Sequence, residues 1–295
     1  MRGPASPSFR RVLLEKKGEV SMQNVEFHLE LNHNATWNMS RLHFHDHCEL
    51  LLPLVSPGNI FVNDQVYPLR RGTLYLIGEN TLHRTMAEGF HARYVLHINK
   101  KSLAQLSTPQ TDLTQLCSAS FRRSELKSGA MTEIIELFQA LERNKNDGSF
   151  GSDMRQTIAL LQLLMRVAPL LNMADAGESI HNKDFLRVAP ILDYIRDNLS
   201  EPLTLDQIAG QFYISKHYLC RVFKAATGFS VMEYIIYSRV LKARRLLQEG
   251  VSVQQAGELS GFSDNSHFIR TFGHLTGLTP GKYAKEYQSG EQVLI

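Results

Sequence analysis

The sequence is poor in tryptophan, cysteine and net charge. Its 295 residues include 1 Trp and 3 Cys, and the formal net charge is +3 at pH 7. Cys48, Cys117 and Cys220 lie far apart and form no Cys-x-x-Cys pair, so the sequence predicts no even set of disulfides. A reducing cytoplasm is therefore the expected location of the protein.

Long apolar runs are also missing from the sequence. No run approaches the ~20 residues that a membrane-spanning helix needs, so we expect no membrane segment. Residues 1–21 carry basic side chains around Val12 to Leu14, an apolar stretch too short for a signal peptide. We expect a poorly ordered arm here, with Met22 as an alternative start. The chain, 43% apolar overall, is long enough for two domains with cores.

A repeat near the C-terminus is the strongest pattern that the sequence does contain. Five residues recur 49 positions later: Arg221, Phe223, Thr227, Gly228 and Tyr234 match Arg270, Phe272, Thr276, Gly277 and Tyr283. Each set is preceded by helical periodicity. Identities at one fixed offset predict two copies of one supersecondary unit.

The first copy has the pattern of a helix-turn-helix motif. Thr204 and Gln207 form a capping-box pattern that opens a helix reaching Phe212. Ser215 is a suitable cap for the next helix, whose apolar residues recur at helical spacing and are expected to face inward. The outward residues of that second helix, which we predict to contact DNA, are Lys216, His217, Cys220, Arg221 and Lys224.

The second copy differs by a turn that is one residue longer. Gly257 stands where two helices must touch, and Phe268 and Phe272 are the expected inward anchors. The outward residues, able to bond base edges or touch a thymine methyl, are Asp264, Asn265, Ser266, Ile269 and Arg270. Between the copies, a helix over 231–248 would span roughly 27 Å and could hold two recognition helices about one DNA turn, ~34 Å, apart.

These motifs together resemble the DNA-binding domain of the AraC/XylS family of bacterial transcription regulators. The matching segments are Leu205 to Ala209, Ser215 to Phe223, Thr227 to Ser230, Arg239 to Leu247, Gly261 to Asp264, Phe268 to Phe272, and Thr276 to Pro280 with Tyr283. Ala256-Gly257 and Ala284 are mild departures from the family pattern. The resemblance implies sequence-specific binding of double-stranded DNA and control of transcription, more often activation, with RNA polymerase as a further partner.

Charge alone does not decide between DNA binding and an all-helical interaction domain. Residues 181–295 hold 13 Lys and Arg against 11 Asp and Glu, well short of a strongly basic footprint. The repeat and the turn pattern therefore carry the prediction, and affinity should depend on phosphate contacts and on salt.

The N-terminal half differs in pattern, because it contains short runs of residues that are typical of β-strands. Strands are predicted near 27–31, 49–55, 60–62, 73–77 and 93–98, with turn residues between them such as Asn63-Asp64 and Arg71-Gly72. Many short strands with such breaks favour a small barrel or jelly roll.

This half resembles the cupin-like sensor domain that commonly precedes an AraC-type DNA-binding domain. His43, His45 and Glu49 match the first cupin motif, and Gly72 followed by His83 matches the second, although Gly78 and Asn80 replace the expected Pro and Gly. In metal-binding cupins these positions converge on one ion, which would be held by His43, His45, Glu49 and His83. Iron, zinc or manganese would suit such ligands.

Three interpretations of that quartet stay open: a functional metal, catalysis, or a pocket-lining or structural role without metal. We favour the last, and so expect no catalytic residue and no cofactor. The resemblance implies a small-molecule effector inside the barrel, most commonly a sugar or sugar derivative. The candidate effector contacts are Trp37, His43, His45, Glu49, Tyr75, His83 and Tyr94.

Two amphipathic helices, near 131–143 and 154–171, follow the barrel. By resemblance they would pair two protomers, and packing only on their own barrel is the alternative. The expected organisation is an arm (1–21), a cupin-like domain (22–108), a helical dimerisation segment (109–172), a linker (173–183) and the DNA-binding domain (184–288). The fold class is therefore α+β multidomain, and the expected function is a cytoplasmic, effector-controlled, homodimeric regulator. The alternative is a cupin metalloenzyme with a helical appendage.

Overall fold

The computed structural model describes residues 27–34, 42–55, 58–87, 91–144, 149–172 and 183–288. The expected arm (1–21), Trp37 and most of the expected linker lie outside these residues. The N-terminal strands are β1 (Phe27–Asn34), β2 (Cys48–Val55), β3 (Gly58–Val62), β4 (Gln65–Pro68), β5 (Thr73–Ile77), β6 (His83–Ala87), β7 (His91–Ile98) and β8 (Phe121–Glu125). The accompanying helices are α1 (Lys100–Leu106), the 3-10 helix η1 (Leu113–Cys117), α2 (Ser128–Asn144) and α3 (Ser152–Asn172).

The strands form two antiparallel sheets. The larger has the order β1-β7-β2-β5-β8, and the smaller has the order β4-β3-β6. The hairpin between β3 and β4 turns at Asn63 and Asp64, whose φ angles of 47° and 63° are the left-handed pair that a tight hairpin needs. Over the described residues the ladders remain two separate sheets and close no barrel, so a closed cupin barrel is not part of the observed fold.

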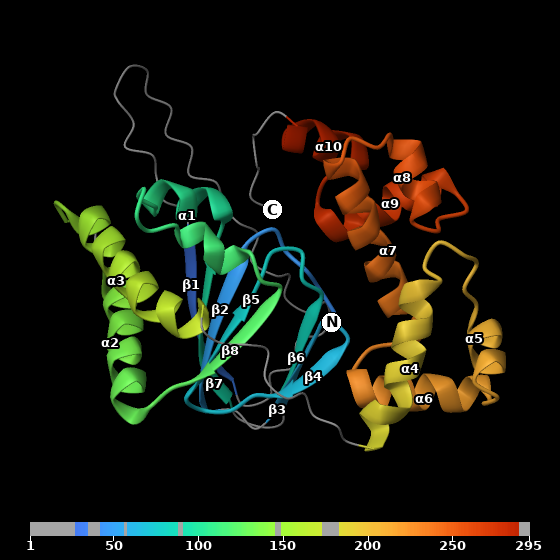
Figure 1. Cartoon of the computed structure of the whole chain (residues 1–295), viewed down its shortest axis with the longest axis horizontal. Coiled ribbons are helices and arrows are strands. Elements are labelled where there is room, and N and C mark those ends of the chain that lie inside the picture. The colour runs from blue at the N-terminus through green and yellow to red at the C-terminus, as the bar shows by residue number, and fades with distance from the viewer. Residues whose placement is uncertain are drawn as a thin grey trace, which may run out of the picture.

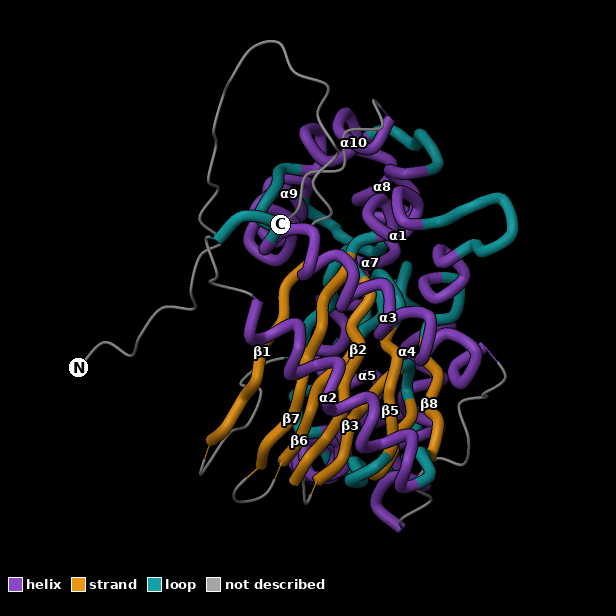
Figure 2. Tube along the Cα trace, turned by 90° about the vertical axis from the view of Figure 1, so that its left-hand side faces the viewer, coloured by secondary structure: helices purple, strands orange, loops and turns teal. Residues whose placement is uncertain are grey.

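Three apolar layers hold the sheets in place. Between the sheets lie Leu51, Ile60, Val62, Tyr67, Leu69, Tyr75, Ile77, Val95 and Phe121, contributed by strands of both sheets. The other face of the larger sheet packs against α2 and α3, and these two helices cross in front of that sheet in Figure 2. The outer face of the smaller sheet contributes Phe61 and Val66 to a core shared with the C-terminal helices.

The predicted strands are confirmed, but three further strands were not predicted. β4 has only 4 residues, and β6 and β8 are mostly polar, so none of the three shows clear apolar alternation. β8 pairs with β5 although it lies in the 109–172 segment that was expected to be helical. α3 continues through Pro169 to Asn172, close to the predicted end at residue 171. A proline near the last turn removes only one helix hydrogen bond.

The structure corrects the prediction for the cysteines. Cys48 and Cys117 form a disulfide, with Cα atoms 5.8 Å apart across a sequence separation of 69 residues. Cys48 opens β2 and Cys117 closes η1, so the fold brings together two positions that look unrelated in sequence. Cys220 is a free, partly buried cysteine.

The C-terminal part is wholly helical. Its helices are α4 (Lys183–Asp197), α5 (Leu205–Gln211), α6 (Lys216–Thr227), α7 (Val231–Gln248), α8 (Val253–Leu259), α9 (Asn265–Thr276) and α10 (Pro280–Gln288). The predicted capping box is present at Thr204–Gln207, and Ser230 forms a second one with Glu233. No helix among the described residues is long and apolar enough to cross a membrane.

The repeat seen in the sequence is explained by matching roles in the two motifs. Phe223 and Phe272 are fully buried. Gly228 and Gly277 end α6 and α9 in the left-handed conformation, with φ of 84° and 73°. The turn of the second motif is one residue longer, as predicted. Tyr213 in the first turn has φ 54°, and Gly261 in the second has φ 90°.

The smaller sheet lies directly against the C-terminal helices, on the side away from α2 and α3 (Figure 1). The rings of Phe61 and Phe229 meet edge to face with centroids 4.8 Å apart. Tyr234 donates a hydrogen bond of 2.6 Å to Asp64, which also contacts Arg196 at 3.3 Å. The two parts of the chain therefore share an apolar contact with polar pairs around it.

Candidate functional site

The outward face of α6 is exposed, as the first helix-turn-helix motif predicted. Lys216, His217, Arg221 and Lys224 are exposed, and Cys220 is partly buried. Ser215 caps the helix by accepting from the Tyr218 amide, while Leu219, Val222 and Phe223 are buried beneath it. The Arg221 guanidinium carbon lies 5.4 Å from the centre of the Tyr218 ring.

The outward face of α9 is exposed in the same way. Asn265, Ser266, Ile269 and Arg270 all reach solvent, and Phe268 and Phe272 are fully buried. Gly257 of α8 permits this packing, because a methyl group added there would lie 2.8 Å from the Phe268 ring. The predicted small-residue position is thus a close approach of two helices.

Two of the predicted DNA contacts have local partners in the structure. The Asp264 side chain caps α9 by accepting from the His267 amide, so its carboxylate is occupied within the motif. Lys216 pairs with Asp206 at 2.8 Å, an exposed ion pair that a phosphate could replace. The sequence interpretation did not single out His267, which is exposed on the first turn of α9.

The basic residues along α7 mostly brace the domain. Arg239 donates to the carbonyls of Leu199 and Glu201. Arg244 is only 4% exposed, and its guanidinium carbon lies 4.9 Å from the Phe44 ring centre and 5.0 Å from that of Tyr283. These contacts fix the helix that joins the two motifs, so Arg239 and Arg244 are engaged within the protein.

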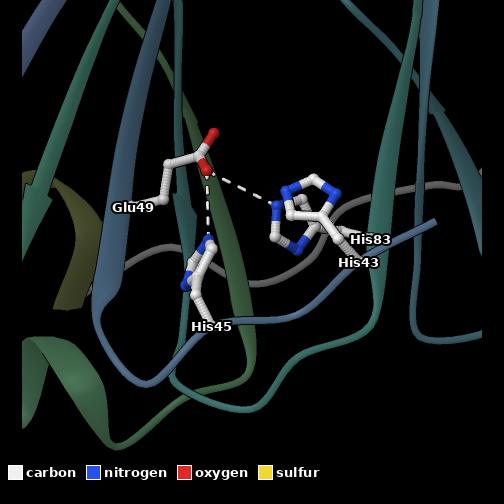
Figure 3. Close-up of side chains that lie close together, drawn as sticks. All are labelled: His43, His45, Glu49 and His83. Atoms are coloured by element: carbon white, nitrogen blue, oxygen red, sulfur yellow. Dashed lines mark hydrogen bonds and ion pairs between the residues drawn. The ribbon is translucent and has the colours of Figure 1, made fainter. Parts of the chain in front are cut away.

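A second site lies between the sheets of the N-terminal part. Glu49 is 1% exposed, and its Oε2 atom lies 3.2 Å from His45 Nε2, 3.4 Å from His83 Nε2 and 3.2 Å from His97 Nε2. His43 completes the group, with its ring centre 4.1 Å from that of His83. Figure 3 shows His43, His45 and His83 gathered beside Glu49. We call these five residues the histidine cluster.

The residues that the cupin motifs single out are thus brought together. One ligand atom each from His43, His45, Glu49 and His83 lies within 4.8 Å of the others, and His45, His47 and His97 form a second such group. The sequence motifs did not single out His97. The signal that could have found it is the ladder register, since Glu49 and His97 are direct partners across β2 and β7.

The protonation states in the cluster follow from its burial and contacts. Burial lowers the pKa of His45 to about 3. Burial raises the pKa of Glu49, but the imidazoles of His45, His83 and His97 outweigh it and hold that pKa well below its usual range. The cluster therefore contains an ionised carboxylate among imidazoles, of which His45 is neutral near pH 7.

The remaining predicted effector residues are not part of this cluster. Tyr75 lies between the sheets, but its hydroxyl already donates to the Pro68 carbonyl and accepts from the Arg70 amide. Tyr94 lies on the opposite face of the larger sheet, where its ring stacks on Phe138 of α2 at 4.8 Å. The placement of Tyr94 inside a barrel was therefore wrong, because that face of β7 packs against helices. Trp37 lies outside the described residues.

Comparison with known proteins bears on the helical domain first. Residues 208–286 match the model of a family described as a helix-turn-helix domain. An uncharacterized HTH-type transcriptional regulator, YfiF of Bacillus subtilis, is 25% identical over 258 residues, which are 85% of this chain and 80% of that protein. The HTH-type transcriptional activator RhaS of Escherichia coli is 24% identical over 78% of this chain and 82% of its own.

Residues 208–286 thus form a helix-turn-helix domain. The similar proteins named above are transcription regulators, and they align with most of this chain. Among solved structures, the apo form of a ToxT variant from Vibrio cholerae is 15% identical and covers 89% of this chain and 98% of its own, with a TM-score of 0.38.

Proposed function

We propose that this chain is a regulator of the AraC/XylS family, which activates transcription from specific promoters under the control of a ligand bound in its two-sheet N-terminal domain. The observation that carries the proposal is the pair of recognition helices, α6 and α9. Both present exposed polar faces while their buried anchors, caps and left-handed ends correspond residue by residue. In this proposal double-stranded DNA is the partner of both faces, and RNA polymerase is the partner of the bound regulator in the cytoplasm.

The N-terminal domain is suited to a sensor role because of its position. In our proposal it is a cupin-like domain that takes a small-molecule effector, and its smaller sheet packs on α4, α6 and α7 through one shared core. A ligand that shifts this sheet would change how the recognition helices are held, which is a coupling between two sites.

Helix α3 supports pairing of two protomers. Leu161, Leu164 and Ala168 pack toward their own sheet, whereas Met154, Ile158 and Met165 are 56%, 53% and 54% exposed. These three recur at intervals of four and seven residues, so they form one exposed apolar stripe. We propose that the stripe joins two copies of the chain, which would place two DNA-binding domains on adjacent sites.

The proposal is tested by selection from a random-sequence duplex pool with the full-length protein at two salt concentrations. We expect enrichment of a two-part site, with an affinity that falls steeply as salt rises. Enrichment of no sequence, in the presence and absence of added ligands, would count against sequence-specific regulation. Turnover of a small molecule without DNA selection would instead favour the metalloenzyme alternative.

A further inference from the structure

The side chains that face Glu49 are oriented by backbone carbonyls. His45 Nδ1 donates to the His47 carbonyl at 2.8 Å, and His83 Nδ1 donates to the Thr81 carbonyl at 2.9 Å. A carbonyl only accepts, so in both rings Nδ1 carries the hydrogen. In the neutral ring the other nitrogen, Nε2, then presents a lone pair.

Both of those lone pairs face the Glu49 carboxyl group. The Nε2 atoms of His45 and His83 lie 3.2 Å and 3.4 Å from Glu49 Oε2, so in the neutral rings an acceptor faces a carboxylate oxygen inside the protein. Among the described residues, Glu49 Oε1 and His83 Nε2 have no hydrogen-bond partner. A cation between these atoms would satisfy them, since buried charges require a partner.

A metal ion fits this gap. A backbone carbonyl that accepts from Nδ1 is the usual support of a metal-bound imidazole. Ligands of a tetrahedral ion at ~2.1 Å would lie roughly 3.4 Å from one another, close to the observed 3.2 Å and 3.4 Å. A sugar fits less well, because the rest of the space between the sheets is filled by buried apolar side chains.

The same two segments also reach the DNA-binding domain. His43 and His83 form a β-bridge. Phe44 and Arg84, which follow them in the chain, lie on the opposite face, toward the helical domain. Phe44 contacts the guanidinium of Arg244 on α7, whereas Arg84 donates to the carbonyl of Gly228, the residue that caps α6. Met86 also touches this cap, since a methyl group added at Gly228 would lie 2.8 Å from its sulfur.

We propose that the histidine cluster binds one divalent transition-metal ion as the signal of this regulator, and that Phe44 and Arg84 transmit its presence to α7 and α6. His43, His45, Glu49 and His83 supply the ligand atoms. His97 positions the Glu49 carboxylate. The ion belongs to the imidazole-preferring group that includes zinc, nickel and iron. The transmission half of this proposal rests on the proposed function.

The first experiment measures metal binding by the full-length protein after chelator treatment. Zn²⁺ and Ni²⁺ are titrated separately by calorimetry into wild type, His83→Gln, His97→Gln and the control His28→Gln, which alters an imidazole on β1 whose ring centre lies 6.2 Å from that of His97. We expect one ion per chain, a loss of about 100-fold or more for His83→Gln and about 10- to 100-fold for His97→Gln, and no change for the control.

Circular dichroism and thermal melting, with and without zinc, check that the variants are folded. His97→Gln replaces a side chain that is 21% exposed, so this variant should keep its circular dichroism and melting transition while losing most of the upward shift in Tm caused by zinc. Equal zinc affinity in wild type and in both cluster variants, or no stoichiometric binding by wild type, would overturn the proposal.

The second experiment measures DNA affinity with a duplex enriched from the random pool, with and without Zn²⁺. We expect at least about a tenfold change for wild type, and a change below about twofold for Phe44→Ala and Arg84→Ala, both of which should retain zinc affinity. A DNA affinity that does not change when zinc binds would overturn the proposed transmission through Phe44 and Arg84, but not the proposed function in transcription. Zinc binding without any DNA selection overturns the proposed function instead.

Discussion

Glu49 and His97 face each other across β2 and β7, with Glu49 Oε2 3.2 Å from His97 Nε2 although 48 residues separate them. The sheet register thus adds His97 to a group that the sequence motifs had limited to four residues. Because several imidazoles share one carboxylate oxygen, loss of the negative charge should affect the whole cluster.

Replacement of Glu49 by Gln should abolish stabilisation by zinc. The amide keeps the shape of the side chain but removes the charge that holds the ion. For wild type, free zinc at about 100 times its Kd should raise the free energy of unfolding by roughly 2.7 kcal/mol, and a chelator should reverse this. Chemical denaturation with and without zinc makes the measurement, with His28→Gln as the control that should respond like wild type.

Arg221→Ala and Arg270→Ala should each weaken specific DNA binding by about 1–3 kcal/mol without changing the fold. Both side chains are exposed on the recognition helices, so truncation removes a DNA contact and little else. Fluorescence anisotropy with the enriched duplex measures the effect. Arg143→Ala on α2, which is also exposed, is the matched control; equal losses in all three variants would contradict the assignment of these faces.

Gly261→Ala should destabilise the helical domain by about 1–3 kcal/mol. Its φ is 90°, and an added methyl group would lie 2.1 Å from the Leu199 carbonyl oxygen. Gly210→Ala on α5 is the control, since an added methyl group there meets nothing within 4 Å and should stabilise the helix by roughly 0.5 kcal/mol. Urea unfolding measures the free energy of unfolding of both variants. Changes of the same sign and size would show that the backbone at Gly261 does not disfavour a side chain.

The contact between Asp64 and Tyr234 should couple the two domains. A double-mutant cycle with Asp64→Ala and Tyr234→Phe should give an interaction energy of about 0.5–3 kcal/mol, because the hydrogen bond of 2.6 Å is partly shielded from water. Additive effects in chemical denaturation would show that the contact contributes nothing.

The same carboxyl should make the domain contact depend on pH. Burial raises the pKa of Asp64, and it outweighs the opposing effects of Tyr234 and Arg196. A raised folded-state pKa means that stability is fully present below the unfolded value of ~3.9 and falls as pH rises through the folded value. Unfolding measured from about pH 4 upward should show this loss for wild type, whereas Asp64→Asn should show a smaller slope.

Charge placed on the exposed stripe of α3 should separate the proposed dimer. Ile158→Glu combined with Met165→Glu puts two carboxylates where apolar side chains would meet, and should raise the dimer dissociation constant by about tenfold or more. Sedimentation equilibrium measures it. Gln139→Glu on α2, which also adds a charge at an exposed position, should leave assembly unchanged; a wild-type protein that is monomeric at all concentrations would exclude this interface.

Local chemistry made most of the helical domain predictable. Thr204 with Gln207 and Ser230 with Glu233 satisfy helix amides within one turn, so these starts can be found from spacing alone. Short apolar runs bounded by turn residues predicted β2 and β5, and such runs are also local features of the sequence. β6 was missed because His83 and Thr85 face the interior while Arg84 and Met86 meet another domain, which leaves no apolar alternation in the sequence.

The tertiary structure decided whatever depends on distant pairing. Tyr94 was assigned to the wrong face because both faces of β7 are buried, and alternation cannot tell which face meets helices. The Cys48–Cys117 disulfide and the addition of His97 to Glu49 likewise depend on which strands and helices are neighbours. The sequence by itself determined the helix-turn-helix repeat, its caps and its outward faces, since those follow from contacts within a few residues. Only the fold determined what Glu49 contacts and how the smaller sheet meets α6 and α7, because those contacts come from side chains that are far apart along the chain.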